Sequence, residues 1–301
     1  MAAVALFNNI TQKYKFMHLK AIKTTSYIYL ILVPVIGAAL AFGIGHVSYK
    51  LYLPIWLLNA LLMTLASWCL GLHVVKQNNS DVNKLAITAF FLIIPWILIS
   101  MFAGLGPPPE TAEEWTKTAK EQQVRYFMLV ISGVFIAFGF VGLREQLKLN
   151  GEYFYSTLSV IAVLLALPLF MINMLYWGFY LTELFKFQTS SNAANFPDWV
   201  QPARQLFGLI SVTEVALTYL ATLLLALSMR RIGWLNFTSG TLYFFFSLLG
   251  FAIIILSAFF QETLKIPGFA VSIPAFPFLM PYFIGVNLLR DIGNNKMGTL
   301  M

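Results

Sequence analysis

The chain has 301 residues, of which 59% are hydrophobic and 10% are charged, and its formal net charge is +7. Soluble domains carry about 25% charged residues, so this composition excludes an ordinary soluble protein. The basic residues lie at the ends of apolar runs instead of forming one patch, which argues against a nucleic-acid-binding protein. Its single cysteine, Cys69, excludes a disulfide framework within the chain.

The N-terminal 25 residues form a basic segment with four lysines, Lys13, Lys15, Lys20 and Lys23. The apolar run that follows is longer than a signal-peptide core of about 7–15 residues, and no convincing small-residue cleavage site follows it. We therefore expect an uncleaved first span. The predicted organisation is the basic segment 1–25, one transmembrane domain over 26–290 and a short tail, 291–301.

A helix needs roughly 20 apolar residues to cross about 30 Å of hydrocarbon. Eight runs are long enough: Tyr27–His46, Leu53–Val75, Ala86–Gly106, Tyr126–Leu143, Tyr155–Phe185, Gln205–Met229, Leu235–Phe260 and Phe269–Leu289. The predicted fold is therefore an all-α bundle of about eight transmembrane spans. The fifth run is long enough that we expect it to tilt or to extend beyond the membrane.

The distribution of Lys and Arg predicts the orientation of the bundle. Segments on the N-terminal side of the membrane hold 12 of the 19 basic residues, and the opposite segments hold seven. Cytoplasmic loops carry the excess of basic residues in most membrane proteins. Both termini are therefore predicted to be cytoplasmic.

Two loops on the opposite side have features of their own. After the three prolines at 107–109, Thr111 and Glu114 have the spacing of a capping box, and a short surface helix is predicted over 112–123. The segment 188–202 is polar and then carries Phe196, Pro197, Asp198 and Trp199. It is either a solvated connector with an interfacial anchor or a lid over a cavity that faces outward.

The second and sixth spans resemble each other when they are aligned at their basic ends. Asn59 lies 17 residues before Lys76, and Glu214 lies 17 residues before Arg231. One interpretation is a parallel four-plus-four repeat with halves 26–150 and 151–290. In that case Asn59 and Glu214 would face each other. The alternative is chance similarity between apolar helices.

Glu214 is the most informative single residue because it lies about ten residues into its span and therefore near the membrane midplane. An ionisable side chain at that depth costs several kcal/mol unless it is neutral or paired. A protonated Glu214 suits a proton-coupled carrier, and an ionised one would suit a cationic substrate. The structural alternative is a protonated carboxyl that hydrogen-bonds to a neighbouring helix as part of the packing.

The helix around Glu214 carries further polar residues. Ser211, Thr218 and Thr222 follow the same face by helical spacing, and Tyr219 is adjacent. Such a stripe must face protein or water. We therefore predict a substrate site that contains Glu214, Ser211, Thr218 and Tyr219.

Two asparagines, Asn59 in the second span and Asn173 in the fifth, also lie at depth in the membrane. Each offers a hydrogen-bond donor and an acceptor. They are either helpers at the substrate site or interhelical hydrogen-bond partners.

The last span contains Pro274, Pro277 and Pro281, a spacing that a continuous helix cannot absorb without a kink or an unwound turn. Broken spans often line the substrate sites of carriers. The alternative is an entry loop before a shorter final helix.

Three histidines at different depths do not fit a haem site, and the chain lacks the His and acidic motifs of metal enzymes. We therefore predict no catalytic residues, no metal site and no cofactor.

The segment Arg230–Leu235, Gly240 and the later segment Pro277–Tyr282 form a loose pattern. In about the last third of the chain, this pattern resembles bacterial multi-spanning inner-membrane proteins of unknown function. The resemblance implies a bacterial inner-membrane location and no particular activity.

The leading functional hypothesis is a small-molecule carrier with Glu214 as a protonatable binding group. The alternative is a non-catalytic membrane subunit or sensor that packs against partner helices through small residues such as Gly139 and Gly142. A lipid-modifying enzyme is a third hypothesis. The expected partners are the lipid bilayer, a small-molecule ligand and a further protein copy or subunit, with no nucleic acid.

Overall fold

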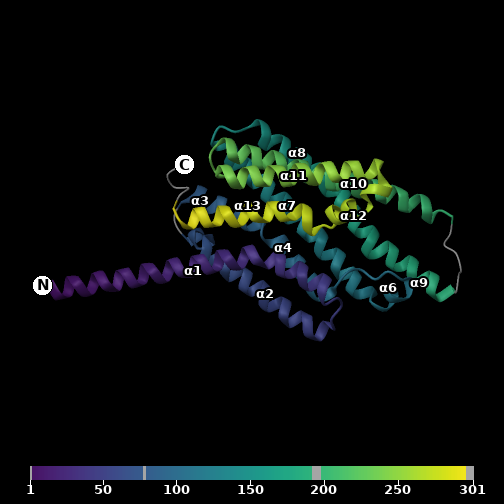
Figure 1. Cartoon of the computed structure of the whole chain (residues 1–301), viewed down its shortest axis with the longest axis horizontal. Coiled ribbons are helices and arrows are strands. Elements are labelled where there is room, and N and C mark those ends of the chain that lie inside the picture. Colours follow the sequence, from purple (N-terminus) through teal and green to yellow (C-terminus); the bar gives the residue numbers. More distant parts are fainter. Residues whose placement is uncertain (1, 77–78, 192–197, 296–301) are drawn as a thin grey trace.

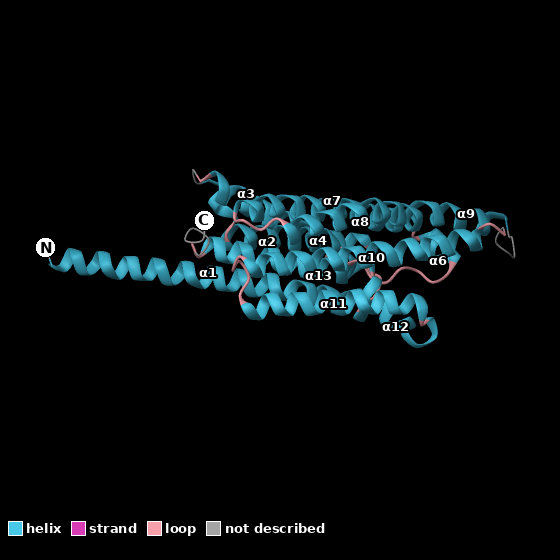
Figure 2. Cartoon of the chain, turned by 90° about the horizontal axis from the view of Figure 1, so that it is seen from above, coloured by secondary structure: helices cyan, strands magenta, loops and turns pink. Residues whose placement is uncertain are grey.

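The computed structural model describes residues 2–76, 79–191 and 198–295, and within these ranges every regular element is a helix (Figures 1 and 2). In chain order the elements are α1 (Ala2–Gly43), α2 (Tyr49–Leu70), η1 (Leu72–Lys76), α3 (Ser80–Phe91), α4 (Ile94–Ile99), α5 (Phe102–Leu105), α6 (Ala112–Lys117), α7 (Ala119–Leu149), α8 (Phe154–Leu175), η2 (Tyr176–Tyr180), α9 (Leu181–Ser191), α10 (Val200–Arg231), α11 (Phe237–Phe259), α12 (Gln261–Ser272) and α13 (Ala275–Gly293). The all-α prediction is confirmed.

Within the described residues, seven helical segments are long and apolar enough to cross a membrane. They are His18–Gly43, Tyr49–Leu70, Ser80–Leu105, Ala119–Leu149, Phe154–Ser190, Val200–Arg231 and Phe237–Phe259. An eighth crossing is formed if α12 and α13, which are bent by 43° at their junction, count as one broken span. These segments correspond to the eight predicted runs and fit an integral membrane protein of the multi-span type.

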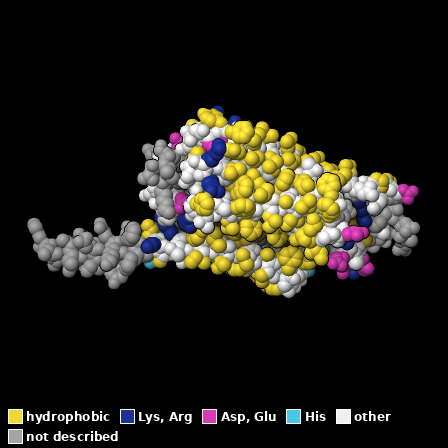
Figure 3. Space-filling model, turned by 45° about the horizontal axis from the view of Figure 1, so that its top comes forward, with side chains coloured by type: hydrophobic (Ala, Val, Ile, Leu, Met, Phe, Trp, Pro, Cys, Tyr) yellow, Lys and Arg dark blue, Asp and Glu magenta, His cyan; other side chains and the backbone are white. Residues whose placement is uncertain are grey.

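The helices run roughly along one long axis, and the start of α1 lies at the same end of the bundle as the end of α13 (Figure 1). On the face shown in Figure 3, a broad apolar belt separates charged side chains that gather at the two ends. We name the end with the start of α1 the basic end and the opposite end, with α6 and α12, the far end. An apolar belt between two charged ends is the surface that a bilayer requires.

Helix α13 lies at the centre of the bundle, where it contacts α1, α2, α3, α4, α10, α11 and α12. Most of its residues from Pro277 onward are buried. The Tyr282 hydroxyl, at the middle of this helix, donates a hydrogen bond to the Leu30 carbonyl of α1 at 2.5 Å. At the basic end, Gly293 and Gly71 let the backbone of α13 approach that of α2 directly. The predicted last span is therefore the core of the fold.

Several predicted boundaries differ from the structure. Helix α1 begins at Ala2, so the segment 1–25 and the first span belong to one continuous helix. The predicted surface helix over 112–123 ends at Lys117, and the next helix, α7, already begins at Ala119. The fifth run ends at Ser191 instead of Phe185, because α8 continues through the π-helical turn η2 into α9; it is therefore extended, as expected from its length. The predicted interfacial residues Phe196 and Pro197 lie outside the described residues.

At the far end, Thr111 is the N-cap of α6, as predicted. The Thr111 hydroxyl accepts a hydrogen bond from the backbone N–H of Glu114 at 3.2 Å, and the Lys117 ammonium lies 2.8 Å from the Glu113 carboxylate. Trp115 is buried, and its indole N–H donates to the Thr182 hydroxyl at 2.9 Å. Helix α6 is thereby attached to α9.

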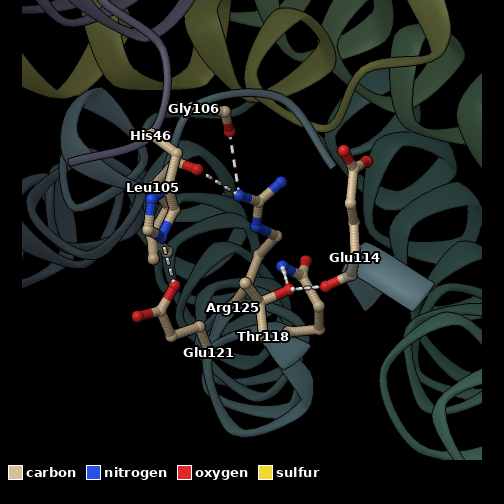
Figure 4. A network of polar contacts seen from close by, with 8 residues as sticks. His46, Leu105, Gly106, Glu114, Thr118, Glu121 and Arg125 are labelled. Carbon is tan, nitrogen blue, oxygen red and sulfur yellow. Dashed lines mark hydrogen bonds and ion pairs between the residues drawn. The ribbon is translucent and has the colours of Figure 1, made fainter. Parts of the chain in front are cut away.

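A polar network holds the α1–α2 turn and α5 against α7 (Figure 4). The buried Arg125 guanidinium donates to the carbonyls of Leu105 and Gly106 at 3.0 and 2.8 Å. One turn earlier on α7, the Glu121 carboxylate lies 2.7 Å from His46 Nε2 in the α1–α2 turn. Arg125 therefore joins the end of the third span to the fourth.

Candidate functional site

Glu214 and Asn173 form a buried polar pair between two spans. Glu214 lies at the middle of α10 and Asn173 near the end of α8, the two helices with the most extensive contact in the bundle. The Asn173 amide Nδ2 donates to Glu214 Oε1 at 2.9 Å. The residues are only 3% and 2% exposed, respectively. The carboxyl that sequence analysis selected therefore has one specific partner, which sequence analysis had also selected.

Only half of the polar atoms of the pair are hydrogen-bonded. Among the residues that the structure describes, neither Glu214 Oε2 nor Asn173 Oδ1 has a hydrogen-bond partner. Both atoms are acceptors when the carboxyl is ionised. A proton on Glu214 Oε2 would turn one of these two unpaired acceptors into a donor. The two unpaired acceptor oxygens therefore favour the neutral, protonated form of Glu214.

A cleft of about 430 Å³ lies on the far-end side of this pair. Its walls come from η2 and α9, from the first half of α10, from α11 and from α12. The lining residues are Tyr176, Trp177, Leu181, Phe185, Arg204, Phe207, Gly208, Ser211, Val212, Ile254, Ser257, Lys265, Gly268, Phe269 and Ser272. A volume of this size suits a small molecule or part of a larger one.

The cleft ends about one helical turn from the buried pair. Ser211 and Val212 line it and precede Glu214 by three and two residues on α10. Tyr176 also lines it and follows Asn173 by three residues. The rings of Tyr176 and Phe207 stack with centroids 3.7 Å apart and join the two walls. Glu214 itself is not part of the lining, so the pair lies beneath the cleft.

The other predicted site residues of α10 have different positions. Ser211 reaches the cleft. The Thr218 hydroxyl donates to the backbone carbonyl of Glu214 at 2.8 Å, so it satisfies its own helix. The Tyr219 hydroxyl donates to the Val271 carbonyl of α12 at 3.1 Å. Tyr219 therefore ties α10 to the broken span.

Asn59 belongs to a different contact. It accepts a hydrogen bond from the Tyr29 hydroxyl of α1 at 2.7 Å and donates to the Ser100 hydroxyl, which follows α4, at 3.0 Å. These partners are interhelical, as in the structural alternative. Asn59 and Glu214 therefore bond to different helices, and the proposed repeat gains no support from these contacts.

The charged and aromatic residues that line the cleft were not among the predicted site residues. Arg204 and Lys265 were counted only as charges that set the orientation, and Tyr176 and Trp177 were part of an apolar run. Helical spacing from Asn173 would have identified the two aromatic residues. No sequence signal indicated that Lys265 of α12 and Arg204 of α10 line one cleft, because this depends on how α12 folds back.

Two further predictions concern the packing. The broken last span does wall a cavity, because four residues of α12 line the cleft. The proposal that Gly139 and Gly142 form a face for partner helices is wrong. A Cβ atom at these positions would lie 2.2 Å from the Leu92 side chain and 2.5 Å from the Thr88 hydroxyl, both within this chain. These glycines pack α7 against its own neighbours, at α3 and the residue that follows it.

The second buried acid, Glu152, lies at the basic end, in the turn between α7 and α8. Its carboxylate accepts the backbone N–H groups of Tyr155 and Ser156 at 3.0 Å each and the hydroxyl of Ser228. Burial raises the pKa of Glu152, but these hydrogen bonds outweigh it and hold the pKa below its usual value. An ionised Glu152 therefore caps α8 and fastens it to α10.

We expect the stability contributed by Glu152 to be lost in acid. A lowered pKa in the folded state stabilises the protein above the pKa of the unfolded chain, and this contribution disappears as pH falls from about 5 to 3. The substitution Glu152→Gln should cost about 1–3 kcal/mol at neutral pH and should flatten the pH dependence. Thermal denaturation at several pH values measures both effects. The exposed Glu145→Gln should leave the curve unchanged; an equal effect of both substitutions would contradict the role of Glu152.

The described residues contain no group of three or more His, Cys, Asp or Glu side chains that could hold a metal ion. The candidate site is the Glu214–Asn173 pair together with the cleft above it. Comparison with known proteins adds no relative: no family model, no curated protein and no solved structure matches this chain.

Proposed function

We propose that the protein is a membrane carrier that takes up a small molecule in the cleft and exchanges a proton at Glu214. The observation that carries the proposal is the half-satisfied Glu214–Asn173 pair, one helical turn below a cleft of about 430 Å³. A buried carboxyl near the midplane is costly, and such groups are typical of proton relays and substrate pathways. The π-helical turn η2, which lines the cleft, supports it further because such turns are frequent at functional sites.

In this proposal the proton on Glu214 is coupled to occupancy of the cleft through the two helices. Tyr176 and Ser211 contact a bound molecule. One turn further into the membrane, Asn173 lies on the helix of Tyr176 and Glu214 on the helix of Ser211. A shift of η2 relative to α10 would lengthen the hydrogen bond between Asn173 and Glu214. Loss of that bond would change how strongly Glu214 holds its proton. Binding and protonation would then be linked.

We place the basic end of the bundle in the cytoplasm and the protein in a bacterial inner membrane. The excess of basic residues at that end supports the orientation, and the resemblance of the last third of the chain supports the location. The cleft then lies in the half of the membrane away from the cytoplasm.

A second candidate function is a non-catalytic membrane subunit in which the pair is only packing. The low exposure of Glu214 and its absence from the cleft lining favour this function. It predicts a Glu214 proton that never exchanges during function.

The test compares the wild type with Glu214→Gln, because glutamine has the shape of a protonated glutamic acid and, like it, offers one acceptor oxygen and a donor group. Melting temperatures are measured between about pH 5 and pH 8 with a panel of amino acids, sugars, nucleosides, organic anions and phospholipids. The carrier proposal predicts that at least one compound stabilises the wild type in a pH-dependent way and that the variant loses the pH dependence. Identical profiles with no stabilising compound would assign the pair to packing.

A further inference from the structure

The cleft has a polar end near the membrane surface and an apolar end deeper in the membrane. Arg204 precedes Glu214 by ten residues on α10, so it lies about 15 Å further toward the far end. Half the hydrocarbon thickness is also about 15 Å. If Glu214 is near the midplane, Arg204 is therefore at the level of the lipid headgroups.

The charged part of the cleft has one sign. Arg204 and Lys265 both line it, and among the described residues of the lining none is acidic. Arg204 also lies close enough to the Tyr176 hydroxyl to interact with it electrostatically. A ligand with an anionic group is therefore the chemistry that this end of the cleft fits.

The remaining lining is apolar and continues onto the surface of the membrane domain. Phe269 is 68% exposed and Trp177 is 39% exposed, although both line the cleft. Deeper in, Phe207, Val212 and Ile254 continue the apolar wall. In a bilayer, the exposed aromatic side chains meet lipid chains, so the cleft is accessible from the lipid phase.

We propose that the cleft binds an anionic phospholipid of the leaflet at the far end, with its headgroup at Arg204 and Lys265 and an acyl chain along Phe207 toward Ser211. The inference rests on the proposed function only in taking the cleft as a ligand site, and it does not depend on proton exchange at Glu214. It makes the carrier substrate an anionic lipid. A soluble anion would meet the same cations but would leave the apolar wall and the lateral opening without a role.

The experiment uses the full-length protein reconstituted in phosphatidylcholine vesicles that contain a minor fraction of a brominated lipid. Bromine quenches nearby tryptophan fluorescence, and Trp177 lies in the cleft. We expect brominated phosphatidylglycerol to quench the cleft signal with an affinity on the order of tenfold higher than brominated phosphatidylcholine. Subtraction of the quenching that remains in Trp177→Phe isolates the contribution of the cleft.

The variant Arg204→Gln/Lys265→Gln should abolish the preference for phosphatidylglycerol. The matched control, Lys50→Gln/Lys120→Gln, removes two exposed cations of the same end that do not line the cleft. This control should keep the preference for phosphatidylglycerol. Equal quenching by both lipids in the wild type would overturn the proposal. Loss of the phosphatidylglycerol preference on addition of inorganic phosphate would also overturn the proposal, because it would mean that Arg204 and Lys265 bind a soluble anion. Glu214→Gln should keep the lipid preference, so a failure of proton exchange can be distinguished from a failure of lipid binding.

Discussion

Substitution of Gly293 or Gly71 by alanine is expected to destabilise the fold by about 3 kcal/mol or more. A Cβ atom at Gly293 would lie 1.9 Å from the Leu70 carbonyl oxygen, and one at Gly71 would lie 2.0 Å from the Leu289 carbonyl oxygen. Both obstacles are backbone atoms, which cannot rotate away as a side chain can. The only relief is to separate α13 from the end of α2.

The effect is measured as the midpoint of thermal denaturation in detergent, followed by tryptophan fluorescence. Gly37→Ala is the matched control, because Gly37 also lies in a helix and a Cβ atom there meets nothing within 4 Å. It should leave the midpoint unchanged or raise it slightly. The clashes at Gly71 and Gly293 are both relieved by the same separation of α13 from the end of α2. The double variant should therefore cost less than the sum of the single variants. Normal stability of Gly293→Ala would contradict the backbone contact between α2 and α13.

Substitution of Arg125 by methionine is expected to cost about 2–5 kcal/mol, because it leaves the buried carbonyls of Leu105 and Gly106 without their donor. It should also loosen the attachment of α5 to α7. The Val47 N–H donates to the Gly104 carbonyl at 2.9 Å, so the α1–α2 turn depends on the same segment. Faster proteolysis within residues 44–48 should therefore accompany the loss of stability.

Two variants distinguish this role from a general effect of removing charge. Arg125→Lys keeps one donor group and should recover part of the loss. Lys120→Met removes an exposed cation of the same helix and should have little effect. If Arg125→Met were as stable as Lys120→Met, the network in Figure 4 would not hold the far end together.

The sequence was sufficient for the membrane class and for the positions of the spans, because the bilayer imposes a minimum length on every apolar helix. It was also sufficient to select Glu214 and Asn173, since each is a polar side chain at depth. It did not identify them as partners. That pairing depends on the register of α8 against α10, which is set by side-chain packing and cannot be derived from the period of either helix.

The cleft and the central position of α13 could not be predicted for a related reason. The three prolines indicated a break in the last span, but not that α12 would lie against α10 and α11 and bring Lys265 to the same cleft as Arg204. Gly139 and Gly142 show the same limit. Small residues indicate close helix contact, but the contact is equally compatible with a neighbour in the same chain, which is where the structure places it.

The most direct test of the central claim is the infrared carbonyl band of protonated carboxylic acids, measured from neutral to alkaline pH in reconstituted protein. The other 11 acidic side chains lie outside the middle of the membrane domain, and comparison with Glu214→Gln isolates the band of Glu214 from theirs. We predict a band at neutral pH that weakens as pH rises, shifts in D₂O and is absent from Glu214→Gln. The variant should keep its stability. A wild-type band that changes neither with pH nor in D₂O would mean that the Glu214 proton does not exchange, and spectra identical to those of the variant would mean that Glu214 is not protonated. Either result would contradict the carrier proposal.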